Sequence, residues 1–265
     1  IPFYVFSLRE NRQSGLLTPS FGRRPIRFGS NEKEWEIRNL GYYLAPNDYM
    51  DLTVAGDLRT SSGWLASMNL GYAVRYLLNG QFQTRLENRH SGGATKWSWW
   101  TSLRHNQEVG ENAQVRATGT FQSNKNFARN NSFNLNDRLD RTLRSNASFS
   151  KRWRGSGNSL SVNASHTEQL DSDRFDTVLP EVSLRKARKP IWDARNPGSR
   201  RGSRGAGAPW YSQIFYDGGA RMRNSRFRRG NDSETQSQTS ANLNLNISSQ
   251  QKPFSWLQIA PRLSE

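Results

Sequence analysis

The side chains that could carry out acid–base or metal chemistry are few and widely separated in this sequence. Its three histidines lie far apart: His90, His105 and His166. None of them has a second ligand at the short spacing that metal sites use. The carboxylates cluster once, in a polar stretch: Asp171, Asp173 and Asp176. There, solvation or contact with divalent ions on an anionic lipid is favoured over catalysis. Cysteine is absent, and so are the phosphate-loop and hydrolase motifs. We therefore expect no enzyme activity, no cofactor and no metal site.

Positive charge is the strongest chemical signal in the chain. The 265 residues hold 38 Lys and Arg against 22 Asp and Glu, a formal net charge of +16. Such a balance predicts a polyanionic partner, which could be nucleic acid, an anionic membrane surface or the phosphates of lipopolysaccharide. The Arg/Gly tract at 198–207 resembles an RNA-binding segment, but a solvated loop between strands is the favoured interpretation.

A long two-faced hairpin over residues 63–89 indicates which elements would position these charges. From Trp64 to Leu78 every second residue is apolar or aromatic, and the residues between are mixed. This period of two is typical of a β-strand with one apolar and one polar face. The alternation resumes after Asn79-Gly80, a pair that predicts a tight hairpin turn. The first run is as long as a transmembrane strand, which needs about 9–11 residues.

The same alternation repeats in about twelve strands, without a convincing helical stripe. Short connections (45–48, 78–80, 108–111, 154–157, 251–253) alternate with longer ones (22–33, 90–95, 122–136, 222–235). Aromatic residues gather near the strand ends on both sides. We therefore predict an all-β fold, an antiparallel up-and-down transmembrane β-barrel that is partial and open. A soluble sandwich or propeller would also alternate, but two aromatic belts and few aliphatic residues favour the membrane barrel.

The composition agrees with strands that have one apolar and one polar face. Hydrophobic residues make up 34% of the chain, yet it holds 9 Trp, 8 Tyr and 13 Phe. The chain contains no run of about 18 apolar residues, so the sequence predicts no transmembrane helix. No signal peptide is recognisable either. The chain starts in mid-pattern without a Met and ends within a strand pattern, so we expect an internal fragment.

Two local irregularities stand out in the first fifty residues. Leu16–Phe21 reads as a short strand that contains Pro19, and a proline there would weaken ladder pairing and suits an edge strand. In Glu34–Leu44 the apolar residues change parity, which predicts a β-bulge. Further along, residues 188–209 break the alternation.

Three segments resemble, in order, the LptD family of lipopolysaccharide-assembly proteins. Arg12–Gly22 is similar to the "R-x-S-G-hydrophobic-x-x-P" segment that opens the barrel of that family. Gly41–Leu52 resembles its next hairpin, where an aromatic pair precedes a "hydrophobic-A-P-N-x-D" turn. Leu179–Val182 resembles an "L-P-E" strand further on. The resemblance covers most of residues 1–190.

The resemblance implies a large outer-membrane barrel that inserts lipopolysaccharide into the outer leaflet through a lateral gate between its first and last strands. Pro19 matches a family proline that weakens pairing at this seam. The implied gate residues are Arg12, Ser14, Gly15 and Pro19. Contact with the lumen or with anionic lipid is expected for Arg23, Arg24, Arg59, Arg75 and Arg85. The implied partners are lipopolysaccharide, an LptE-like plug lipoprotein, an LptA-like periplasmic bridge protein and the outer membrane, with no nucleic acid.

The resemblance also divides the chain into two parts. Residues 1–8 would be the end of a periplasmic jelly-roll domain, and 9–265 the N-terminal portion of the barrel. The sequence departs from the family in having no cysteines, so the disulfides of some members cannot form. Two alternatives stay open, a different outer-membrane barrel (a porin or receptor) and a soluble basic β-protein that binds nucleic acid.

Overall fold

The chain is built almost wholly of β-strands. The computed structural model describes residues 12–26, 31–91, 93–132, 135–191, 213–229, 234–249, 251–254, 257–259 and 261–264. The strands are β1 (Gly15–Leu16), β2 (Ser20–Pro25), β3 (Lys33–Asn47), β4 (Met50–Arg59), β5 (Gly63–Val74), β6 (Leu78–Ser91), β7 (Ala94–Glu108), β8 (Ala113–Gln122), β9 (Thr142–Arg152), β10 (Ser159–Gln169), β11 (Arg174–Pro190), β12 (Ile214–Arg228), β13 (Gln236–Ser249), β14 (Gln251–Phe254), β15 (Leu257–Ile259) and β16 (Arg262–Ser264). Two short helices are α1 (Phe127–Asn131) and α2 (Leu135–Leu139). Among the described residues, no helix is both long enough and apolar enough to cross a membrane.

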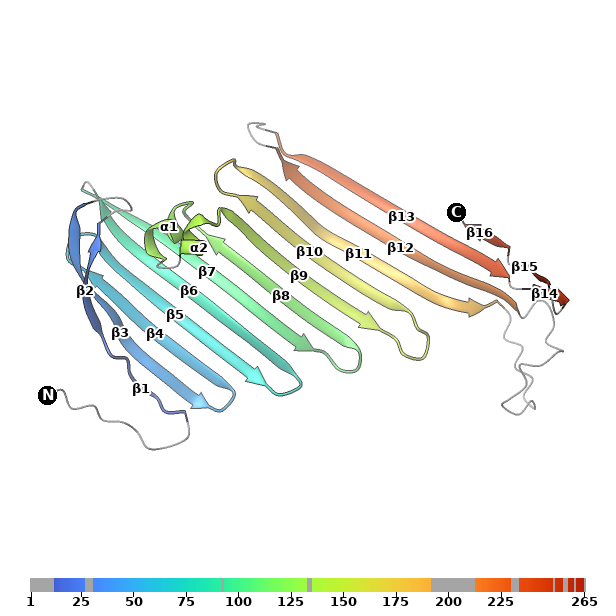
Figure 1. The fold of residues 1–265 in the computed structure, drawn as a ribbon, viewed down its shortest axis with the longest axis horizontal. Helices are drawn as coiled ribbons and strands as arrows, with labels where there is room; N and C mark the ends of the chain where they lie inside the picture. The colour runs from blue at the N-terminus through green and yellow to red at the C-terminus, as the bar shows by residue number, and fades with distance from the viewer. Residues whose placement is uncertain are drawn as a thin grey trace.

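The strands form one broad antiparallel sheet in chain order (Figure 1). Its 14 strands run from β1 through β3 and its successors to β13 and β16, and β2 also pairs with β3. Strands β14 and β15 form a separate pair. In the described part of the chain no pairing joins the first strands to the last, so the sheet is open. The predicted antiparallel up-and-down order is confirmed. The predicted count of about twelve strands agrees with this sheet once β1 and β2, which are parts of one first strand, are counted together.

The two faces of the sheet differ as the alternation predicted. A single row of the apolar face crosses five strands in register: Leu44, Leu52, Leu70, Phe82 and Leu103. Large apolar side chains on this face are open to the surroundings, with Val54 48% and Leu243 80% exposed. No second layer covers them in the described residues, so this face suits contact with lipid.

The hairpin of β5 and β6 turns earlier than Asn79-Gly80 predicted. The turn is formed by residues 75–77, and Tyr76 adopts the left-handed conformation with φ 63°. Gly80 instead lies within β6, where an added Cβ would come 2.3 Å from the ring of Tyr72 and 2.7 Å from the carbonyl of Arg104. The glycine therefore makes room for an aromatic ring opposite, and the Asn-Gly signal was wrong as a turn.

Three predicted loops contain regular structure. The loop at 22–33 is shortened because β2 continues to Pro25, and the one at 222–235 because β12 continues to Arg228. The polar loop at 122–136 holds α1 and the start of α2. The predicted bulge is confirmed, since the register of β3 against β4 shifts between Ile37 and Leu40.

The connections fall at two ends of the sheet. The turn end carries residues 48–49, 75–77, 109–112 and 153–158, and the loop end carries 26–32, 60–62, 92–93, 123–141, 170–173 and 229–235. The predicted difference in length holds only in part, because 60–62, 92–93 and 170–173 at the loop end are short. The connection between β11 and β12, 191–213, is at the turn end, and most of it, including the Arg/Gly tract, lies outside the described residues. Residues 1–8 also lie outside them.

Candidate functional site

The pairing of β1 and β2 with β3, here called the first-strand seam, contains all four predicted gate residues. The register is the same on both sides of a gap, with Leu16 opposite Tyr42 and Ser20 opposite Arg38. Residues 17–19 belong to neither strand. The first strand is therefore one strand with a break, and Pro19 lies in the break.

The break coincides with a missing rung of the ladder. Leu17 donates its N–H to the Gly41 carbonyl at 2.9 Å, so the next residues that would exchange backbone hydrogen bonds are Pro19 and Asn39. Pro19 has no N–H to donate. Asn39, with φ 62°, donates its N–H to Oδ1 of Asp57 on β4 at 2.9 Å. Neither residue can give its backbone proton to the other, so the backbone ladder is interrupted here. A long hydrogen bond from Nδ2 of Asn39 to the Thr18 carbonyl, at 3.4 Å, crosses the break instead.

The other predicted gate residues lie on the turn-end side of the break. Ser14 Oγ accepts a hydrogen bond from the Ala45 N–H at 2.8 Å. Arg12 pairs with Asp51 on β4 at 3.2 Å, in an exposed position. Gly15 lies opposite Tyr43, and a Cβ added to it would meet nothing within 4 Å. These contacts are local and exposed, so each contributes little stability.

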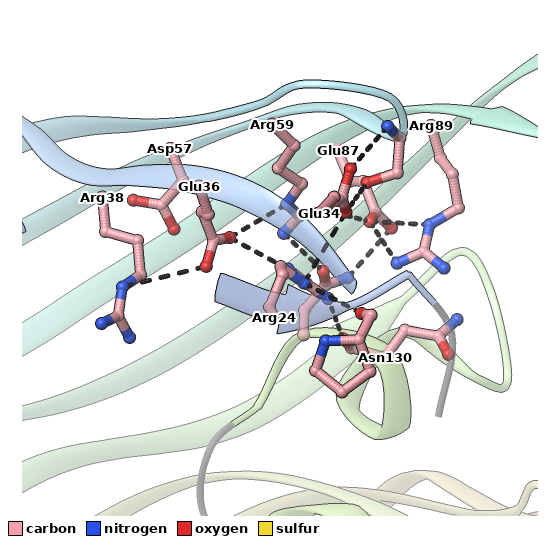
Figure 2. Close-up of polar contacts among 12 residues, drawn as sticks. Arg24, Glu34, Glu36, Arg38, Asp57, Arg59, Glu87, Arg89 and Asn130 are labelled. Carbon is pink, nitrogen blue, oxygen red and sulfur yellow. Dashed lines mark hydrogen bonds and ion pairs between the residues drawn. The ribbon is translucent and has the colours of Figure 1, made fainter. Parts of the chain in front are cut away.

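On the loop-end side of the break, the seam joins a buried network of charges on the polar face (Figure 2). This buried network consists of Arg24, Glu34, Glu36, Arg59, Glu87 and Arg89. It links β2, β3, β4 and β6, so it ties together strands that are not all neighbours. Its three arginines balance its three glutamates, as burial of charge requires.

Arg59 is the centre of the buried network. Its Nε donates to Glu36 at 3.1 Å and its Nη1 to Glu87 at 2.9 Å. The three side chains are almost fully buried, with exposed fractions of 1% for Arg59 and 3% for each glutamate. Nη2 of the same guanidinium donates to the Asn131 side chain of α1 at 3.0 Å. A buried charge set this well hydrogen-bonded fixes the relative positions of its strands.

The remaining carboxylates of the buried network are also fully engaged. Glu34 accepts hydrogen bonds from the backbone and hydroxyl groups of Ser61 and Ser62, in the turn between β4 and β5. Glu87 accepts from Ser98 on β7 at 3.0 Å and from the Asn131 amide at 2.9 Å. The network therefore extends from the first strand to β7.

The connection between β8 and β9 folds back onto the polar face and covers the buried network. Phe127 of α1 is buried, with 1% of its surface exposed. Arg24 of the first strand donates to the backbone carbonyl of Asn130 at 3.0 Å (Figure 2). Arg24 thus attaches the first strand to the connection 123–141.

Both ends of that connection are also held at the surface. Arg141 donates to Asp171, in the turn between β10 and β11, at 2.9 Å and 2.8 Å, and Lys125 pairs with Asp173. The hydrogen bond from Arg141 lowers the pKa of Asp171 below its ordinary value. The Arg141–Asp171 contact is therefore present at neutral pH and is lost only as the pH falls through that lowered pKa. Two members of the predicted acidic cluster, Asp171 and Asp173, thus anchor the connection, and Asp176 lies within β11.

The five arginines predicted to meet the lumen or anionic lipid occupy different places. Arg24 and Arg59 belong to the buried network. Arg85 lies on the polar face, 5.1 Å from the ring of Trp100. Arg23 stacks over Trp35 at 4.6 Å, in the row that continues the apolar face. Arg75 lies in the turn at residues 75–77, over Tyr76 at 4.7 Å. None of these positions tests the predicted contacts.

Several residues of the site were missed at the sequence level. Asn39 and Asp57 belong to the missing rung, and Glu36 and Glu87 to the buried network. The change of parity in Glu34–Leu44 was a signal for the first pair. For Glu36 and Glu87, the sequence signal of a buried network was the presence of charged residues at polar-face positions close to a loop. Among the described residues, no group of three or more potential metal ligands comes together.

Comparison with known protein families shows which family the chain belongs to. The family model described as "LptD protein" matches residues 1–264, nearly the whole chain. No curated protein matches the sequence. The open antiparallel sheet and its exposed apolar face agree with the predicted resemblance. The chain therefore belongs to the LptD protein family.

Proposed function

We propose that this chain forms the first part of the wall of an outer-membrane barrel that inserts lipopolysaccharide into the outer leaflet through a lateral opening between its first and last strands. Family membership supports transport of lipopolysaccharide at the outer membrane. The observation that carries the lateral opening is the missing rung between Pro19 and Asn39, because a first strand that is loosely paired with β3 can shift and so part more easily from the last strand of the barrel.

The two faces of the sheet give this function its physical basis. The exposed apolar face would contact lipid, and the polar face would line the lumen. Charged arginines of the lumen, such as Arg85, would meet the phosphates of lipid A through charge-assisted contacts. This is transport without covalent chemistry, so we propose no enzymatic step.

The partners follow from the family and are part of the proposal. An LptE-like lipoprotein would plug the lumen, and an LptA-like bridge would deliver lipopolysaccharide from the periplasm. Residues 1–8 would end a periplasmic jelly-roll domain, and 9–265 would belong to the barrel. The chain enters the sheet from the turn end, where the first described residues lie (Figure 1), so this end would face the periplasm.

The Pro19→Ala variant tests the lateral opening. It supplies the missing N–H opposite Asn39, and a net backbone hydrogen bond contributes about 0.5–1.5 kcal/mol. We expect a stiffer first-strand seam and slower export. The measurement is the rate at which new lipopolysaccharide reaches the surface of cells depleted of the native protein and rescued by the full-length variant. Pro25→Ala, in the same strand beside the buried network, is the matched control, and equal export in both variants would contradict the proposal.

A further inference from the structure

The apolar face of the sheet becomes polar and cationic at its loop-end corner, over β10, β11 and β12. The row of side chains that crosses this face continues strand by strand through six residues: Leu103, Gly119, Ser145, His166, Thr177 and Arg226. Cross-strand neighbours in one row share a face of the sheet. Arg226 therefore lies on the face that would meet lipid, and not on the face that would line the lumen.

Arg226 is exposed, and its guanidinium makes no ion pair or hydrogen bond within the part of the chain that the structure describes. On the opposite face of the same strand, Arg221 donates its Nε to Glu181 at 3.1 Å. An arginine on a lipid-facing wall is tolerated close to the membrane interface, where it can meet an anionic headgroup. The lack of a protein partner for Arg226 thus points to a partner in the membrane.

The neighbours of Arg226 on this face add to the positive charge. The guanidinium of Arg228, two residues further along β12, lies 4.9 Å from the ring centre of Phe175. His166 is hydrogen-bonded to the Thr177 hydroxyl at 2.7 Å. Glu168 belongs to the same face, 3.9 Å from His166. The described residues of this corner therefore present two guanidinium groups against one carboxylate.

The corner lies at the height of the membrane interface. At the other edge of the apolar band, Lys186 lies 4.9 Å from the ring centre of Tyr216. Lys186 is opposite Gly218, eight residues from Arg226 along β12. At about 3.4 Å per residue and a tilt of about 35–45°, this separation gives roughly 20 Å of height, close to the apolar band of about 25 Å in outer-membrane barrels. Arg226 and Lys186 thus lie near the two headgroup layers.

A shallow groove of about 260 Å³ lies beside Arg226 on the same face. Small side chains from β8, β9 and β10 line it: Gly119, Ser145, Ala147 and Ala164. Larger apolar side chains from β7, β8 and β11 flank them: Leu103, Phe121 and Leu179. The groove starts in the row of Arg226 and extends toward the turn end, so an acyl chain in it would point into the bilayer.

We propose that this corner, here called the outer-wall site, binds a lipopolysaccharide molecule of the outer leaflet, with a phosphate of lipid A on Arg226 and an acyl chain in the groove. Guanidinium and phosphate form charge-assisted hydrogen bonds, often as a bidentate pair. The inference rests on the proposed function only for the orientation of the sheet, which places the loop end in the outer leaflet. The outer-wall site is separate from the first-strand seam and from the lumen.

The chemistry of the outer-wall site favours lipid A over other anions. Arg226 and Arg228 lie two residues apart on one face, so they offer two cations to a headgroup with more than one phosphate. A zwitterionic phospholipid carries one phosphate and brings a cation of its own. Free phosphate would leave the groove unfilled.

The outer-wall site is tested with a photo-crosslinking residue in place of Ser237, which lies opposite Arg226 on β13. The full-length protein is reconstituted in phosphatidylcholine nanodiscs that contain a small fraction of lipid A. The lipid that becomes cross-linked is identified by mass spectrometry. We expect capture of lipid A although phosphatidylcholine is in large excess.

The phosphate contact is tested from both sides. Arg226→Gln should lower the yield of cross-linked lipid A about tenfold, as expected for loss of a charge-assisted hydrogen bond. Dephosphorylated lipid A should be captured equally poorly by the protein with Arg226 intact, which needs no variant at this site. Arg223→Gln is the matched control, because Arg223 lies on the opposite face of β12, and its yield should equal that of the parent. Capture of phosphatidylcholine alone, or equal capture by the parent and Arg226→Gln, would exclude the site.

The groove is tested by filling it. Ala164→Phe should lower the capture of lipid A, whereas Val162→Phe, on the same face of β10 and outside the groove, should not. Heat-modifiable migration shows that each variant has folded, and Ala164→Leu takes the place of a variant that has not. Equal capture by the two variants would exclude the groove as the place of the acyl chain. Because binding in nanodiscs requires no export, failure of the site leaves the proposed function intact, and export from depleted cells tests that function separately.

Discussion

At the scale of single residues, Arg59 shows how much one side chain can fix. It bridges Glu36 on β3 and Glu87 on β6, which are separated by two strands in the sheet. Removing one partner of a buried ion pair leaves the other charge without compensation, which costs about 3–5 kcal/mol. Loss of the Arg59 guanidinium would leave the buried carboxylates of Glu36 and Glu87 without one of their positively charged partners.

We therefore expect Arg59→Ala to destabilise the barrel by about 3–5 kcal/mol. The measurement is the urea midpoint for unfolding of the full-length protein in detergent, read from its heat-modifiable migration in gels. Arg85→Ala is the matched control, because Arg85 lies on the same face and stacks on Trp100 without entering the buried network. Equal midpoints for the two variants would contradict a structural role for the network.

At the scale of elements, α1 is held by one apolar side chain and by the buried network. Phe127 is almost fully buried, and truncation of a buried Phe to Ala costs about 3–5 kcal/mol. Because this exceeds what a five-residue helix can supply by itself, Phe127→Ala should release the connection 123–141 from the polar face. Limited proteolysis of the folded protein would then cut within this connection. Leu135→Ala serves as the control, since Leu135 is 61% exposed in the same connection, and cleavage in both variants or in neither would contradict the prediction.

The elements also show how far the sequence could predict the structure. Period-two alternation identified the long strands, because in each of them every second side chain belongs to the apolar face of the sheet. The two helices were missed because five residues are too few to show a helical stripe. Gly80 was misread as a turn residue. A glycine is needed there because the ring of Tyr72 on the neighbouring strand occupies the space of a Cβ, and the local sequence pattern does not show this contact.

The candidate site was predictable only in its local part. Pro19 was found because the effect of a proline on a strand follows from its own chemistry. The role of Asp57 depends on a register shift between β3 and β4, and the partnership of Arg24 with Asn130 joins residues 106 positions apart. Contacts of this kind appear only once the strands are aligned and the connection 123–141 has folded back.

At the scale of the whole molecule, the described residues form a single main sheet, and none of them forms a second layer over its apolar face. If lipid covers it, a charge placed in the middle of this face should prevent assembly, whereas a charge on the opposite face should not. An arginine facing lipid near the bilayer midplane costs about 2–4 kcal/mol in a transmembrane β-barrel. Val54 and Thr53 are adjacent in β4 and point to opposite faces, since Val54 lies in register with Met68 and Thr53 with Asn69.

Val54→Arg should therefore lower the amount of folded full-length protein in the outer membrane several-fold, and Thr53→Arg should leave it nearly unchanged. The measurement is the folded fraction in purified outer membranes, again from heat-modifiable migration. The pair controls for the added charge, the strand and the depth, because only the face differs. If both variants assemble equally well, the apolar face does not meet lipid at this point. If Thr53→Arg alone fails, the two faces have been assigned the wrong way round.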